Sequence, residues 1–264
     1  MNIFENNENI IYRNSNGIEY IQFKRLLELG IKNAYTLKGK DINFRTSDPN
    51  TINNYSKIFK ELDLDINSLQ KPIQRHTSNV KCIDKKESSE YFENVDGLIT
   101  DKKGLTLATT NADCILLMFY DPVKKVIANV HSGWRGTFQK IAEKTLVKMI
   151  TNYRCEAKDI LVFICPSIRK CHFEVDEDVK KLCEDIFSFT NRLDEFIFKG
   201  KIIDGLQKYN IDTVKINRIL LTDLGVKDEN IIDCGICSVC NSDKISSYRV
   251  EGKDFKLATA IISL

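Results

Sequence analysis

The sequence is short of the residues that several classes of metalloprotein require. It has three histidines in 264 residues, His76, His131 and His172. Oxidases that contain several copper ions bind them through imidazole ligands, and such a centre would need many more than three histidines. A chain with this composition can still hold a small site for a single metal ion.

Long apolar runs and strong charge are also missing. No run approaches the roughly 18 residues that span a bilayer, and the polar, acidic start lacks the basic and apolar parts of a signal peptide. The net charge of +2 gives no reason to expect nucleic acid or an anionic membrane as a partner. We therefore expect a cytoplasmic protein. Its nine cysteines are expected to be reduced thiols, since an odd number also argues against a complete disulfide framework.

What the sequence does contain is enough apolar residues, 42%, for a substantial core. Short apolar runs alternate with segments of helical spacing, and there is no internal repeat or Pro/Ser-rich linker. This pattern predicts one mixed α/β domain over residues 1–264. A hairpin is expected around Asn16-Gly17, helices over 52–62, 176–187 and 211–224, and strands over 161–165, 246–249 and 257–262.

The stretch from residue 95 to residue 136 is the part most suited to chemistry. Residues 115–120 predict a buried strand, Pro122 a turn, and residues 126–130 a returning strand. A hairpin symmetric about Pro122 and Val123 would place Cys114 directly opposite His131, with their Cβ atoms about 5 Å apart. Such a pair suits two ligands of one metal ion, or a thiolate and its base.

A helix is predicted to follow this hairpin. Helical spacing covers residues 137–150 and begins just after a glycine-flanked loop. Arg135 lies beside the expected helix start, where backbone N–H groups favour anions. Arg135 and Arg249 are therefore our candidates for holding phosphate.

His76, in a polar loop, would complete a set of three ligands with Cys114 and His131. Two His and one Cys with an open fourth position resemble a catalytic zinc site. Asp113 and Glu174 are candidates for moving a proton. The same residues also allow a cysteine hydrolase, with Cys114 as the nucleophile and His131 as the base.

The segment CGICSVC at residues 234–240 looks like part of a metal cluster motif. It lacks a nearby fourth cysteine, and no second pair of cysteines with zinc-site spacing stands elsewhere in the sequence. We therefore expect Cys234, Cys237 and Cys240 to be buried thiols near the active site.

Several motifs together resemble the laccase-domain family, also called the multicopper polyphenol oxidase family, whose bacterial members are regarded as purine nucleoside phosphorylases. The matching segments are DGLIT (96–100), ADC (112–114), HSGWRG (131–136), CPSI (165–168), CHFEV (171–175), INR (216–218), CSVC (237–240) and SYR (247–249). Thr77 stands where the family usually has Gly, and His172 where Cys is common.

The resemblance implies a layered α/β sandwich with mixed sheets flanked by helices, and His76, Cys114 and His131 as ligands of one zinc ion. It implies phosphorolysis of adenosine, inosine and S-methyl-5'-thioadenosine, together with deamination of adenosine. The partners would be purine nucleosides and phosphate, bound by a monomer or homodimer. We add Asn43 and Arg45 to Arg135 and Arg249 as substrate contacts.

Three alternatives remain beside the zinc phosphorylase. The older family name suggests a copper-dependent polyphenol oxidase, and imidazole and thiolate do suit copper. A Cys-His hydrolase using Cys114 would work after removal of metal. A purine- or metal-binding regulator would bind zinc without turnover.

Overall fold

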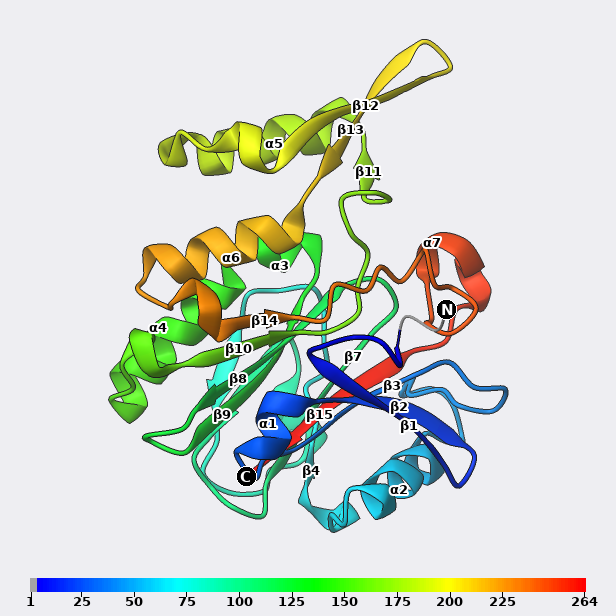
Figure 1. Cartoon of the computed structure of the whole chain (residues 1–264), viewed down its shortest axis with the longest axis vertical. Helices are drawn as coiled ribbons and strands as arrows, with labels where there is room; N and C mark the ends of the chain where they lie inside the picture. The colour runs from blue at the N-terminus through cyan, green and yellow to red at the C-terminus, as the bar shows by residue number, and fades with distance from the viewer. Residues whose placement is uncertain (1–3) are drawn as a thin grey trace.

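The computed structural model describes residues 4–264 and is built on two six-stranded sheets (Figure 1). The first sheet begins with the hairpin predicted at Asn16-Gly17, where both turn residues have positive φ angles, 51° and 76°. Its strands, in spatial order, are β1 (Ile10–Ser15), β2 (Ile18–Phe23), β3 (Lys32–Thr36), β15 (Ala258–Ser263), β7 (Thr106–Asn111) and β4 (Leu69–Gln70). The short helix α1 (Lys24–Glu28) connects β2 to β3.

The second sheet contains the central hairpin. Its strands, in spatial order, are β14 (Ile231–Asp233), β10 (Leu161–Ile164), β8 (Ile115–Asp121), β9 (Val126–Ser132), β6 (Gly97–Thr100) and β5 (Val80–Cys82). The pairs β10–β8, β8–β9 and β9–β6 are antiparallel, whereas β14 runs parallel to β10 and β5 parallel to β6.

The two sheets pack face to face. Alternate residues of β8, namely Leu116, Met118 and Tyr120, join Phe23 and Ile262 of the first sheet in one buried cluster. The intervening residues of β8 point to the other face of the sheet, as the two-residue period of a strand requires. There they pack against helix α4 (Ile141–Tyr153) and helix α6 (Thr213–Asp223). Helix α2 (Thr51–Glu61) covers the outer face of the first sheet.

The result is a layered α/β sandwich with mixed sheets flanked by helices, which confirms the predicted fold class. A third, small sheet projects from it with helix α5 (Glu177–Phe187), at the top of Figure 1. Its strands are β11 (Glu174–Val175), β13 (Leu206–Ile211) and β12 (Ile197–Ile203). Within residues 4–264, no helix is long and apolar enough to cross a membrane.

Two predicted elements were wrong. The helix expected over 137–150 is broken: α3 (Trp134–Phe138) ends before Lys140, which has a positive φ of 61°, and α4 then begins. The strand expected over 246–249 is instead the start of helix α7 (Tyr248–Glu251), because the Ser247 hydroxyl accepts a hydrogen bond from Val250 N–H and caps it.

Candidate active site

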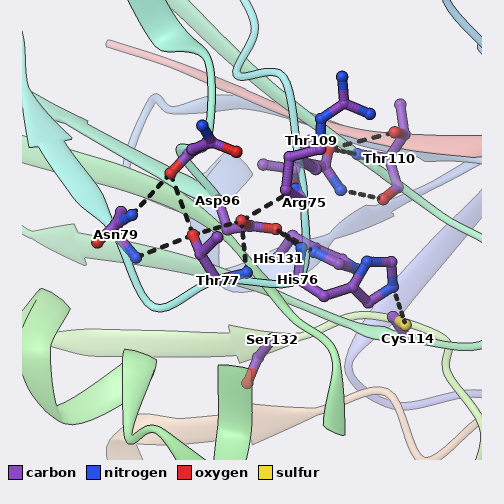
Figure 2. Close-up of polar contacts among 12 residues, drawn as sticks. Arg75, His76, Thr77, Asn79, Asp96, Thr109, Thr110, Cys114, His131 and Ser132 are labelled. Atoms are coloured by element: carbon purple, nitrogen blue, oxygen red, sulfur yellow. Dashed lines mark hydrogen bonds and ion pairs between the residues drawn. The ribbon is translucent and has the colours of Figure 1, made fainter. Parts of the chain in front are cut away.

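Three side chains with metal-binding atoms meet at one end of the sandwich. His76 comes from the loop between β4 and β5, Cys114 from the loop that carries the chain from β7 in the first sheet to β8 in the second, and His131 from β9. Their ligand atoms all lie within 4.8 Å of one another. The Cys114 sulfur is 3.8 Å from Nε2 of His76, and Figure 2 shows it facing that ring.

The register that brings Cys114 to His131 differs from the predicted one. In the structure Leu116 pairs with His131, and Ile115 with Ser132, so the strands are shifted by two residues from the expected pairing. The cause is a longer turn, in which Lys125 N–H bonds to the Asp121 carbonyl and the Asp121 carboxylate accepts from Val123 and Lys124. A shift of two residues keeps each side chain on its face, so the two residues still meet.

Asp96 positions the other residues of the site, a role that its place in the DGLIT motif did not predict. Its fully buried carboxylate accepts a bond of 2.8 Å from Nδ1 of His131, so that Nε2 of that ring faces the cluster. The same carboxylate accepts from the backbone N–H groups of Arg75, His76 and Thr77 and from the Thr77 hydroxyl (Figure 2). Burial alone would raise the pKa of Asp96, but the bonds from His131 and Thr77 lower it.

The backbone of His76 needs that support. Its φ of 60° lies in the left-handed region, which is costly for a residue with a Cβ. The hydrogen bond of 3.0 Å from His76 N–H to Asp96 holds this conformation. One carboxylate thus positions two of the three candidate ligands, one through its ring and one through its backbone.

Gly133 leaves room for the cluster. A Cβ at this position would lie 2.8 Å from Cδ2 of His76, 3.3 Å from the Cys114 sulfur and 3.3 Å from Cε1 of His131. The φ of Gly133 is −61°, which any residue can adopt. The glycine is therefore required by the space that the three side chains occupy.

Cys114 and His131 stabilise each other's charged forms. Burial opposes the Cys114 thiolate, but the rings of His131 and His76 lower its pKa to about 6. Burial also opposes a charge on His131, yet the thiolate and Asp96 raise its pKa to about 9. The thiolate is the form of cysteine that binds metal and attacks electrophiles.

The donor set fits a catalytic zinc ion. Imidazole nitrogen and thiolate sulfur are zinc ligands, and three protein ligands leave a fourth position for water or substrate. The carboxylate on the far side of His131 is the usual orienting partner of a zinc-bound histidine. His76 is exposed and His131 is buried, so the cluster lies between the core and the solvent.

A cavity of about 910 Å³ opens above the three residues. Arg45, Arg135, Arg249 and Asp113, all predicted to take part in the reaction, line it. Aromatic side chains also line its wall: Trp134, Phe173, Tyr248 and Phe255. The volume is within the range of sites for small molecules, which is about 300–1,000 Å³.

Asn43 and Glu174 are not among the side chains that line this cavity. Asn43 accepts bonds from the N–H groups of Arg45 and Leu257 and donates to Asp48, so it holds the loop that carries Arg45. Glu174 starts strand β11, and its carbonyl oxygen accepts a bond from the Arg249 guanidinium. Their direct contact with substrate stays a prediction.

Arg135 and Arg249 are placed differently. Arg135 is exposed, with its guanidinium carbon 4.2 Å from the centre of the Trp134 ring. Arg249 donates to the carbonyl oxygens of His172 and Glu174, and its backbone N–H donates to Asp113. Because α3 has only five residues, the predicted helix start near Arg135 is too short to add much of a dipole.

We predicted that all three cysteines of residues 234–240 are buried, and this prediction was wrong for one of them. Cys234 and Cys237 are buried, but Cys240 is exposed. Cys237 and Cys240 lie beside Cys171 and His172 in a second group of metal-binding atoms. Sequence spacing could not reveal this group, since its two halves are 66 residues apart.

The fold and the site together define an α/β sandwich protein with a His-Cys-His centre at the floor of a cavity. The sequence profile of the family described as "Multi-copper polyphenol oxidoreductase laccase" matches residues 33–263. The chain belongs to this family, as its motifs indicated.

Named relatives agree with this assignment, and a solved structure shares the fold. The chain is 34% identical to Purine nucleoside phosphorylase LACC1 of Mus musculus over 72% of this chain and 42% of that protein, so it matches less than half of that relative's length. It is 29% identical to Adenosine deaminase RL5 of an unknown prokaryotic organism over 72% of each chain. The Bacillus licheniformis protein YfiH has the same fold, with a TM-score of 0.83 at 23% identity over 96% of this chain and 98% of that one.

Proposed function

We propose that this protein is a zinc-dependent purine nucleoside phosphorylase that also deaminates adenosine. Relatives named for each activity support an enzyme of this kind. The observation that carries the proposal is the convergence of His76, Cys114 and His131 at the floor of a cavity lined by arginines and aromatic rings. The expected substrates are adenosine, inosine and S-methyl-5'-thioadenosine.

His76, Cys114 and His131 would hold the zinc ion, with Asp96 orienting His131 and the loop of His76. When bound, zinc supplies a Lewis acid and makes water acidic enough to act near neutral pH. Asp113 lines the cavity beside Cys114 and is better placed than Glu174 to carry a proton during deamination. Its two oxygens accept bonds from Ser238 and from the backbone of Arg249, which fix its orientation.

Phosphorolysis requires phosphate near the sugar carbon and a binding surface for the base. Arg135 is the strongest phosphate candidate, because it lines the cavity and, among the described residues, its guanidinium is not bonded to a carbonyl oxygen as those of Arg45 and Arg249 are. The rings of Phe173, Tyr248 and Phe255 would offer flat apolar surfaces on which a purine can pack. Arg45 stacks 4.1 Å from the centre of the Phe255 ring and stiffens that wall.

The test is to incubate the zinc-loaded protein with adenosine or inosine, with and without phosphate, and to identify the products by mass. Phosphorolysis gives a free base and a sugar phosphate only when phosphate is present. Deamination converts adenosine to inosine with or without phosphate. Neither product from any of the nucleosides would contradict the proposal.

One observation favours a second candidate, a cysteine hydrolase. Cys114, His131 and Asp96 are arranged in series as a thiolate, an imidazole and a carboxylate, and the pKa of Cys114 is lowered to about 6. Cys114→Ser separates the two functions. If Cys114 is a zinc ligand, the variant loses the zinc ion at the cavity and all activity together, because a neutral hydroxyl is a much weaker ligand than a thiolate. A nucleophile predicts full zinc content without turnover, and a wild-type enzyme that works after chelation.

A copper oxidase has less support. Of the three histidines in the chain, His172 belongs to the second group of metal-binding atoms, which leaves two at the cavity. Copper centres with several ions use more imidazole ligands than this. Metal analysis showing several copper ions and no zinc would reverse this choice.

A further inference from the structure

Two cysteine-containing loops meet at one edge of the second sheet. The first follows β10 and carries Cys171 and His172, and the second follows β14 and carries Cys237 and Cys240. Since β10 and β14 are parallel neighbours, their carboxyl ends lie at the same edge. The pairing continues beyond the strands, where Ser238 N–H bonds to the Ser167 carbonyl.

The four side chains present their ligand atoms to a common centre. The Cys171 sulfur lies 3.6 Å from that of Cys237 and 3.9 Å from that of Cys240. Nδ1 of His172 lies 3.2 Å from the sulfur of Cys171, 3.7 Å from that of Cys237 and 3.5 Å from that of Cys240. All four atoms are within 4.8 Å of one another.

These separations are close to those of a tetrahedral zinc site. Zinc–sulfur bonds of about 2.3 Å and zinc–nitrogen bonds of about 2.0–2.1 Å place two sulfurs about 3.8 Å apart and a sulfur and a nitrogen about 3.5 Å apart. The sulfur–sulfur distances are too long for a disulfide, which needs about 2.05 Å. All cysteines within residues 4–264 are free thiols.

We infer that Cys171, His172, Cys237 and Cys240 form a second zinc site, separate from the centre at the cavity and structural in character. Three cysteines and one histidine are a known structural zinc set, and they fill all four positions of the ion, so that none is left for a substrate. This inference goes beyond the proposed function and does not depend on it.

The second site would brace one wall of the cavity. Ser238 lies between two of the ligands, and its hydroxyl donates a bond of 2.6 Å to the carboxylate of Asp113. The Arg249 guanidinium donates a bond of 3.0 Å to the carbonyl oxygen of the ligand His172. Asp113 and Arg249 both line the cavity, so the ion would position them without touching the substrate.

The first experiment measures zinc per chain in full-length protein purified with reductant and zinc. Wild type should hold about two ions, and Cys240→Ser and Cys114→Ser about one each. Cys82→Ser, half-buried and outside both groups, is the matched control and should keep both. His172→Ala should lose the second ion, whereas His172→Cys, which restores a four-ligand set, should keep it. One ion in wild type, unchanged in Cys240→Ser, would overturn the inference.

A second measurement needs no variant and therefore does not depend on how a variant folds. Cys171 and Cys240 are exposed, so in wild-type protein an alkylating reagent should modify them much faster after chelation than with zinc bound. Peptide mapping by mass assigns each site. Equal modification with and without zinc, or a mass showing that these cysteines form a disulfide in reducing buffer, would refute the zinc site.

Discussion

The carboxylate of Asp96 lies 2.8 Å from Nδ1 of His131 and at the same time accepts the backbone N–H of His76. A single buried side chain thus fixes the ring of one candidate ligand and the left-handed backbone of another. A substitution of Asp96 can therefore test the proposed metal centre without changing any of the three candidate ligands.

Asp96→Asn keeps the size of the side chain but removes its charge and one of its two acceptor oxygens. We expect the affinity for zinc at the cavity centre to fall by about 10- to 100-fold, as for other losses of an orienting carboxylate. Competition with a chromophoric chelator measures this. Asp121→Asn is the matched control, since Asp121 is also buried but supports the far turn of the hairpin. Equal zinc affinity in wild type and Asp96→Asn would contradict the orienting role.

Gly133→Ala adds one methyl group against all three candidate ligands. Crowding a well-packed site costs about 1–3 kcal/mol, which corresponds to a loss of roughly 5- to 150-fold in zinc affinity at this centre. Because the backbone conformation at this position suits alanine, the circular dichroism spectrum should stay that of wild type. Only the affinity for zinc should fall. A variant that binds zinc as tightly as wild type would show that the ligands can move apart freely.

Arg135→Lys keeps the positive charge but loses the planar fork that binds two phosphate oxygens. We expect the KM for phosphate to rise by roughly tenfold if about 1.4 kcal/mol of binding is lost, with little change in deamination, which uses water. Arg249→Lys is the comparison. Since Arg249 lines the cavity and its guanidinium is held by the carbonyl oxygens of His172 and Glu174, both reactions should decline. Equal losses in Arg135→Lys would argue that Arg135 only supports its loop.

Lys71 makes the free energy of unfolding depend on pH. Burial lowers its pKa from 10.5 to about 8. Between these two values the unfolded chain binds more protons than the folded one, so this residue's contribution to stability rises with pH. The free energy of unfolding of wild type relative to Lys71→Met should therefore increase from about pH 8 to about pH 10.5.

Denaturant unfolding at several pH values measures that difference. Lys103→Met, at an exposed turn, controls for the loss of one positive charge. A constant difference between wild type and Lys71→Met across this window would mean that Lys71 titrates alike in the folded and unfolded chains.

Local patterns were sufficient for the fold class and for the three candidate ligands. The strands around Cys114 and His131 follow from apolar runs, whereas His76 was predicted from its place in a polar loop and from the family resemblance. The register was wrong because it depends on how Asp121 closes the turn, which a run of apolar residues does not specify. The break at Lys140 was missed for a similar reason, since helical spacing continues through it.

Residues distant in the sequence were the hardest to predict together. Asp96 was visible only as part of a motif, because its bonds reach residues 19 to 35 positions away. Cys171 and Cys237 meet only because β10 and β14 are neighbours in the sheet. No spacing rule applies to ligands that tertiary structure brings together.

Because the three candidate ligands come from separate segments of the chain, the proposed zinc centre would make the amount of the protein depend on the supply of metal. In the unfolded chain His76 and Cys114 are 38 residues apart, so a zinc ion at the proposed centre would bind almost only to the folded form. A ligand that binds only the folded form stabilises it by about 2.7 kcal/mol at 100 times its Kd. Cells short of zinc would then hold a larger share of opened chains, and proteolysis of these would lower the amount of the protein as well as its activity.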